Sequence, residues 1–115
     1  GRIVGLSSIW GKISKEYRAS YSASKFALDG MTLALAIEHG ADGILAKCVA
    51  PGFIDTELTR RVVGEEQIQR LLSIVPARRM ANVEEIARFV VWLGSPDNTY
   101  ITGQNIAIDG GFSRA

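Results

Sequence analysis

The stretch SYSASKFALDGMTLALAIEHGADGILAKCVAPG, residues 20–52, places a long helical pattern directly before a short apolar run. Between residues 20 and 38, small and large apolar side chains recur around most of the helix circumference, which predicts a helix covered on several sides. The pair His39-Gly40 predicts the helix end, with glycine in the left-handed cap conformation. Residues 44–50 predict a buried strand, which a proline-glycine pair stops.

The flanking sequence repeats this alternation of strand and helix. Residues 2–7 and 105–109 are short apolar runs that predict two further strands. Helical patterns cover residues 56–64, 65–75 and 82–93, and the last opens with a capping-box-like Asn-Val-Glu-Glu. Strands separated by helices predict parallel strands under covering helices, an α/β class. Lys47 interrupts the central strand, and the sequence offers no reason for that charge.

Size and composition limit the function classes. The 115 residues, 47% of them hydrophobic, suffice for one globular domain, residues 1–115. Thirteen basic and 12 acidic side chains leave a net charge of +1, which argues against nucleic acid or an anionic membrane as partner. No apolar run approaches the ~20 residues that span a bilayer. A single cysteine, Cys48, inside an apolar run predicts a buried thiol and a reducing, cytoplasmic setting.

Three residues indicate proton-transfer chemistry. Tyr21 and Lys25 are four residues apart, so they share one face of the predicted helix. A phenol is a poor proton donor at neutral pH, and a nearby cation favours its phenolate form. Ser8, at the end of the first strand, could hydrogen-bond a carbonyl or alkoxide oxygen at the same point. Together they predict a site for carbonyl/alcohol chemistry.

Other conspicuous residues favour structural interpretations. His39 fits the end of a helix better than a catalytic base. Trp10 follows the first strand and could either line a pocket or pack on the surface. Trp92 is expected in the core or an interface. One histidine and one cysteine, with scattered carboxylates, lack metal-ligand spacing.

Four motifs in order resemble the C-terminal half of a short-chain dehydrogenase/reductase, and most closely the 3-oxoacyl-(acyl-carrier-protein) reductase group. They are Ile3-Val4-Gly5-Leu6-Ser7-Ser8 followed by Gly11; Tyr21-Ser22-Ala23-Ser24-Lys25; Val49-Ala50-Pro51-Gly52-Phe53-Ile54-Asp55-Thr56; and Tyr100-Ile101-Thr102-Gly103-Gln104 through Asp109-Gly110-Gly111. The resemblance covers essentially the whole chain. It implies half of a Rossmann-type doubly wound parallel sheet, here three parallel strands with covering helices.

The resemblance also implies roles for the first three residues. Ser8 would hold the substrate oxygen, and Tyr21 would be the general acid for reduction or the base for oxidation. Lys25 would favour the Tyr21 phenolate and bind the nicotinamide ribose. The hydride would come from NAD or NADP, and the substrate would be a small carbonyl compound or alcohol.

Cofactor contacts are implied for the turn after the second strand. Pro51 and Gly52 would shape this turn, and the backbone of Ile54 would meet the nicotinamide carboxamide. The Thr56 hydroxyl would lie near the carboxamide or the pyrophosphate. Residues 57–80 would form a mobile lid over the substrate.

The chain also departs from the family pattern. Many members carry Asn at the positions of Gly5 and Lys47, and carrier-protein reductases often carry a basic residue where Asp42 stands. No glycine-rich phosphate loop occurs in these residues. Gly1 is followed at once by a core strand, so we expect a piece of a longer protein.

Three functions therefore remain to be weighed. The first is an NAD(P)-dependent oxidoreductase that reduces a ketone or oxidises a secondary alcohol. The second is a catalytically inactive fragment that acts as a self-associating module through its free strand edge. A nucleotide-sugar epimerase or dehydratase shares the Tyr-x-x-x-Lys motif, but it carries a long C-terminal substrate domain. Family members are commonly dimers or tetramers, so self-association is expected as well.

Overall fold

The computed structural model describes residues 1–115 and contains one three-stranded parallel sheet in the order β1-β2-β3. The strands are β1 (Arg2–Leu6), β2 (Leu45–Pro51) and β3 (Asn105–Ile108). In the register, Val4 of β1 pairs with Lys47, and Ile106 of β3 pairs with Val49. The central strand β2 is buried along nearly its whole length, as its apolar sequence predicts.

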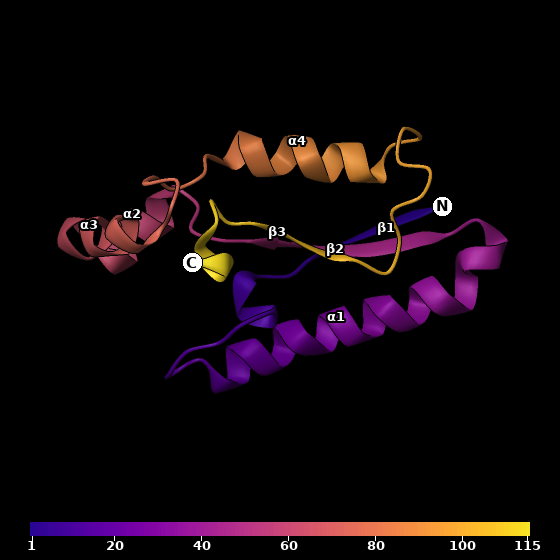
Figure 1. Ribbon diagram of the computed structural model, residues 1–115, viewed down its shortest axis with the longest axis horizontal. Helices are drawn as coiled ribbons and strands as arrows, with labels where there is room; N and C mark the ends of the chain where they lie inside the picture. Colours follow the sequence, from indigo (N-terminus) through magenta and orange to yellow (C-terminus); the bar gives the residue numbers. More distant parts are fainter.

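Two long helices cover opposite faces of this sheet, α1 (Ala19–His39) on one side and α4 (Val83–Gly94) on the other (Figure 1). Two shorter helices, α2 (Glu57–Val63) and α3 (Glu65–Ile74), lie beyond the carboxyl ends of the strands. The remaining elements are three short 3-10 turns: η1 (Ile9–Gly11), η2 (Gly40–Asp42) and η3 (Phe112–Arg114). The predicted α/β class and the order of all elements are confirmed.

At the ends of the two covering helices, the predicted capping box of α4 is correct, and the left-handed conformation predicted for Gly40 after α1 is wrong. The capping box of α4 forms: the Asn82 side chain accepts from the Glu85 N–H at 2.9 Å, and Glu85 accepts from the Asn82 N–H. The left-handed cap at Gly40 does not form, since Gly40 has φ −58° and continues into η2. Gly43, with φ +75°, makes the left-handed turn instead, three residues later.

Helix α1 is less covered than its sequence predicts. Only Ser22, Thr32 and Ala36 are buried on it. Large apolar side chains on other parts of its circumference are exposed, namely Phe26, Met31, Leu33 and Ile37. The prediction of a helix covered on several sides is therefore wrong for this chain by itself, because one sheet face can cover only one stripe of a helix. No helix of the chain is long and apolar enough to cross a membrane.

The core under the two helices holds a thiol and a charge. Cys48 is fully buried, as predicted, and donates to the Thr32 hydroxyl at 3.2 Å; burial raises the pKa of this thiol. Lys47 is also fully buried, and its ammonium donates to the Leu45 carbonyl at 3.0 Å. Burial, with Arg2 nearby as a second cause, lowers the pKa of Lys47. The structure gives this lysine no acidic partner.

Candidate active site

The loops that follow the three strands meet at one edge of the sheet, because parallel strands share one carboxyl end. Each loop contributes one aromatic ring to a cluster of three: Trp10 after β1, Phe53 after β2 and Phe112 after β3. The rings pack edge to face, with centroids 5.1–6.4 Å apart. This cluster holds the three loops together beside the predicted catalytic residues. Of the two roles considered from the sequence, Trp10 has both, since it packs in this cluster and also lines the cleft beside it.

The loop after β1 is also held tightly against the start of α1. At Gly11 an added Cβ would lie 2.9 Å from Cβ and 3.0 Å from the carbonyl carbon of Lys25, so only glycine permits this approach. The Ser7 hydroxyl donates to the Lys25 carbonyl at 3.4 Å, and the hydroxyls of Ser14 and Ser22 are 2.7 Å apart. These contacts fix the position of the strand end relative to the first turns of α1.

As a result, Ser8 and Tyr21 line one cleft of about 700 Å³. We call it the Ser8–Tyr21 cleft; its lining includes Ser8, Trp10, Tyr21 and Gly52, with Leu58 and Val62 from α2. Ser8 is buried, and its Oγ accepts from the Trp10 N–H at 3.2 Å, which leaves the hydroxyl proton free to donate. Tyr21 is 44% exposed, and its ring lies one helical turn from Lys25.

Lys25 lies next to Tyr21 and does not line the cleft itself. Its Nζ is 5.7 Å from the centroid of the Tyr21 ring and donates to the Leu6 carbonyl at 2.9 Å. That bond fixes the ammonium near the end of β1 and uses one of its three N–H donors. The other two remain for a ligand.

The turn after β2 carries the residues expected to contact the cofactor. Pro51 ends β2, and Gly52 donates from its N–H to the Ile108 carbonyl at 2.9 Å. A Cβ at Gly52 would lie 2.8 Å from the Cα of Asp109, so glycine is required where this turn passes the end of β3. Gly52 lines the cleft, whereas Pro51 does not.

Ile54 forms an isolated parallel bridge with Ala81. The bridging bonds run from the Asp55 N–H to the Ala81 carbonyl at 2.8 Å and from the Ala81 N–H to the Phe53 carbonyl at 3.0 Å. In this pattern the N–H and C=O of Ile54 itself take no part and remain available. One free donor beside one free acceptor is the arrangement that a primary carboxamide matches.

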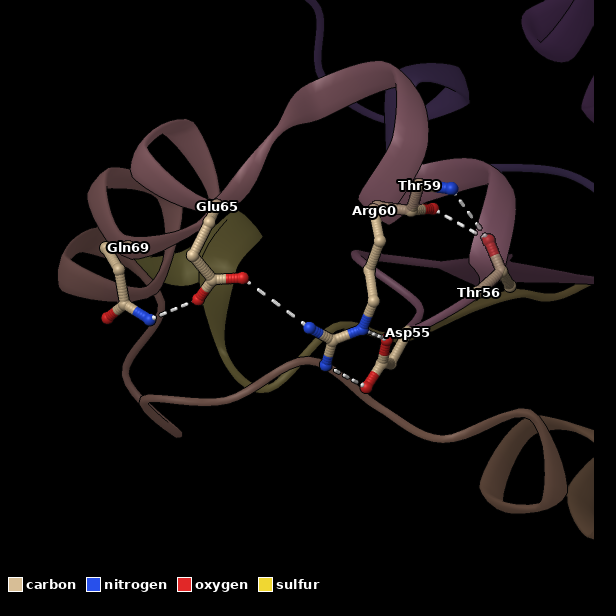
Figure 2. A network of polar contacts seen from close by, with 6 residues as sticks. All are labelled: Asp55, Thr56, Thr59, Arg60, Glu65 and Gln69. Atoms are coloured by element: carbon tan, nitrogen blue, oxygen red, sulfur yellow. Dashed lines mark hydrogen bonds and ion pairs between the residues drawn. The ribbon is translucent and has the colours of Figure 1, made fainter.

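Thr56 has a structural role in this chain, as a helix cap. It is the N-cap of α2, where its Oγ1 accepts from the Thr59 N–H at 3.1 Å and lies 2.9 Å from the Thr59 hydroxyl. Figure 2 shows this cap beside Arg60, whose guanidinium makes two bonds to the Asp55 carboxylate, at 2.6 and 2.7 Å. The Arg60 hydrogen bonds lower the pKa of Asp55. Arg60 also approaches Glu65 of α3 at 3.6 Å, so one cation links the turn to both short helices.

The two ends of residues 57–80 are held together, since the Ile54–Ala81 bridge joins residues that flank the segment on either side. On α2, Leu58 and Val62 line the cleft although they are 60% and 71% exposed. Contact with an apolar ligand would therefore bury these two side chains and stabilise the complex.

Some cleft residues were not singled out in the sequence. They are Tyr17, Arg18, Ser20, Thr59 and Val63, of which the first two belong to an irregular loop without periodicity. The only sequence signal of Tyr17, Arg18 and Ser20 is their position just before Tyr21. His39, as predicted, lies at the end of α1, where it pairs with Asp42 at 3.2 Å. Trp92 is 40% exposed and stacks on Phe89, so it is not a core residue.

Comparison with known proteins places these features in a family. The family model described as enoyl-(acyl carrier protein) reductase matches residues 1–113. The chain is 40% identical over 111 residues to the 3-oxoacyl-[acyl-carrier-protein] reductase FabG of Pseudomonas aeruginosa. It is 41% identical over 111 residues to the acetoacetyl-CoA reductase of Rhizobium meliloti. Each alignment covers 96% of this chain, but only 44% and 46% of the relatives, so the chain spans less than half of their length.

Among solved structures, a blue fluorescent protein from a metagenomic library, crystallised in complex with NADPH, superposes with a TM-score of 0.88. The two sequences are 38% identical, and the superposition covers 97% of this chain and 45% of that protein. The comparisons confirm the predicted fold class, a parallel α/β sheet of the Rossmann type.

Proposed function

Since the chain belongs to the enoyl-(acyl carrier protein) reductase family of short-chain dehydrogenases/reductases, we propose that it carries the proton-transfer site of an NAD(P)-dependent oxidoreductase. The reaction is reduction of a ketone or, in reverse, oxidation of a secondary alcohol. One observation supports this most strongly. Ser8 and Tyr21, from different elements and 13 residues apart, line the same cleft, with the Lys25 ammonium beside the phenol.

Tyr21 acts as the proton donor to the carbonyl oxygen during reduction and takes the proton back during oxidation. The Lys25 cation stabilises the phenolate that remains after the transfer. Ser8 donates its free hydroxyl proton to the same substrate oxygen, where negative charge develops in the transition state. The Trp10 N–H supports this orientation, because it occupies an acceptor site of Ser8 and not its proton.

The residues present fit the nicotinamide end of the cofactor. Lys25 keeps two free donors for ribose hydroxyls, and the unpaired backbone groups of Ile54 suit the carboxamide. Pro51, Gly52 and Thr56 form the turn that carries Ile54. When bound, the nicotinamide supplies or accepts the hydride. NADPH in the solved relative supports a nicotinamide dinucleotide, NAD or NADP, as the cofactor.

The relatives' activities point to the class of substrate. Reductases named for 3-oxoacyl-[acyl-carrier-protein] and acetoacetyl-CoA act on carbonyl groups within acyl chains. The apolar side chains of Leu58 and Val62 line the cleft and suit such a chain. We assign residues 57–80 the role of a lid that closes over it, hinged where the Ile54–Ala81 bridge joins its two ends.

A second role, self-association, is favoured by the exposed face of α1. Phe26, Leu33 and Ile37, at i, i+7 and i+11, are large apolar side chains on one face of α1 that this chain leaves 47%, 48% and 75% exposed. A contiguous apolar surface of this kind usually marks an interaction site. Sedimentation of the chain should show a dimer or larger species, and Ile37→Glu should shift it toward monomer. A monomer at all concentrations would refute this role.

The enzymatic proposal is tested with the variant Tyr21→Phe in the longest natural polypeptide that contains residues 1–115. NADPH and NADH absorbance is followed with a panel of ketones and acyl thioesters, and cofactor affinity is measured by fluorescence titration. The variant removes only the hydroxyl, so turnover should fall about 100-fold or more while cofactor affinity stays within about twofold. Near-normal turnover in Tyr21→Phe, or no turnover of any carbonyl by the parent, would refute the proposal.

A further inference from the structure

The Ser8–Tyr21 cleft has one charged side chain among the residues that line it, Arg18. No carboxylate lines the cleft. A second cation, the Lys15 ammonium, lies 5.3 Å from the centroid of the Trp10 ring, which itself lines the cleft. The local charge at the site of the proposed chemistry is therefore positive, although the whole chain carries a net charge of only +1.

The guanidinium of Arg18 has no anionic partner in the chain. It forms none of the ion pairs, and its hydrogen bond from Nη1 goes to the carbonyl of the neighbouring Tyr17 at 3.2 Å. By contrast, Arg60, Arg70 and Arg79 each pair with a carboxylate. A guanidinium carries five N–H donors in a planar fork, so most of the donors of Arg18 remain free for a ligand.

The backbone fixes where Arg18 enters the cleft. Tyr17 has φ +60°, a left-handed conformation that non-glycine residues rarely adopt, and it directs the chain into α1. Arg18 is the N-cap residue of α1, so it is anchored one turn before Tyr21 on the same helix. Arg18 and Tyr21 are three positions apart, at i and i+3, and both line the cleft.

The remaining lining suits an apolar body. Trp10 forms one aromatic wall, and α2 contributes the exposed side chains of Leu58 and Val62. A ligand that uses every part of this lining has a carbonyl group for Ser8 and Tyr21 and an apolar segment against α2. It also has an anionic group within reach of Arg18.

We propose that Arg18 is a specificity-determining residue that binds an anionic group, a carboxylate or a phosphate, of the carbonyl substrate. The inference rests on the proposed oxidoreductase function, because it concerns the substrate of that same site. Bidentate bonds from a guanidinium to a carboxylate or phosphate supply geometric selectivity as well as affinity. Uncharged carbonyl compounds of the same length should bind more weakly.

The test compares matched substrates in the catalytically active polypeptide that contains this chain. One pair is an oxo acid and its methyl ester; the other is an acyl thioester of phosphopantetheine and the same thioester of pantetheine. For Arg18→Gln, KM for the preferred anionic substrate should rise about 10- to 100-fold, while kcat changes less than about threefold. KM for the uncharged partner of that pair should stay unchanged.

Two further variants separate charge from structure. Arg18→Lys should recover part of the affinity because it keeps the charge and loses the fork. Arg88→Gln removes the same charge from an exposed arginine of α4 that forms no ion pair and does not line the cleft, and it should leave both KM values unchanged. The pair of substrates that responds identifies the anion as carboxylate or phosphate.

Equal effects of Arg18→Gln on charged and uncharged partners, or no effect on either pair, would overturn the assignment of Arg18. Such a result would leave the proposed function standing, since that depends on the response to Tyr21→Phe. Loss of the anion preference in Arg88→Gln would also overturn it, because the preference would then depend on the overall charge of the chain and not on Arg18.

Discussion

The substitution Gly11→Ala tests how the site is assembled, because Gly11 is where the loop after β1 touches α1. An alanine Cβ would lie 2.7 Å from Ser7 Oγ, 2.9 Å from Lys25 Cβ and 3.0 Å from the Lys25 carbonyl carbon. The serine side chain can rotate away, but the backbone of α1 cannot. To restore ordinary contact, which begins at 3.4 Å, the loop must retreat by roughly half an ångström.

Overpacking of this size costs about 1–3 kcal/mol of unfolding free energy. The same retreat moves Ser8 away from Tyr21. Because a 1 Å misplacement of catalytic groups can lower turnover about 100-fold, half of that distance should lower it about tenfold. Denaturant unfolding of the chain measures the first effect, and carbonyl reduction by the catalytically active polypeptide measures the second.

Gly30→Ala is the matched control. Gly30 lies inside α1, and a Cβ there meets no atom within 4 Å. The same one-carbon addition should therefore stabilise the chain by about 0.5–1 kcal/mol, through helix propensity, and leave turnover unchanged. A Gly11→Ala variant that matches Gly30→Ala in stability and keeps full turnover would refute the close-approach argument.

Two buried or paired charges give predictions about stability and pH. Lys47→Met should raise the unfolding free energy at pH 7 by about 1–3 kcal/mol, because it removes a charge that burial disfavours. Since burial lowers the pKa of Lys47 in the folded chain, wild-type stability should increase as the pH rises above that lowered pKa toward 10.5. A Lys47→Met variant whose stability shows the same slope would contradict the account. The Arg79 guanidinium, with the Asn82 N–H, lowers the pKa of Glu85 to about 2. The stability that the ionised Glu85 adds to the folded chain should therefore be complete above about pH 4.5 and decline toward pH 2. Glu85→Gln should thus lower the melting temperature at pH 7 and match wild type near pH 2; a difference independent of pH would count against the ion pair.

Much of the fold could be predicted because its signals are local. The apolar run that ends at a proline-glycine pair predicts β2, and the box from Asn82 to Glu85 predicts the start of α4. The end of α1 at His39 was predicted correctly, but the left-handed residue is Gly43 and not Gly40, because both glycines are equally able to adopt that conformation. A local i, i+3 pairing of His39 with Asp42 accompanies continuation of the chain through Gly40.

The site could be predicted only in part. Ser8, Tyr21 and Lys25 were predicted from spacing and from the family resemblance, and the structure places Ser8 and Tyr21 in one cleft. Arg18 lies in an irregular loop, where no periodicity indicates which way a side chain points. The buried position of Lys47 was equally out of reach, because a charge in a strand normally indicates a solvent-facing position.

The central claim is that Ser8 and Tyr21 act on one and the same substrate oxygen. The most direct measurement is a double-mutant cycle of kcat/KM with Ser8→Ala, Tyr21→Phe and the double variant, in the catalytically active polypeptide. Groups that act as a unit are strongly non-additive, so the double variant should lose little more activity than the worse single variant, which should itself lose about 100-fold or more. Losses that simply multiply, or a single variant with near-normal kcat/KM, would contradict the claim.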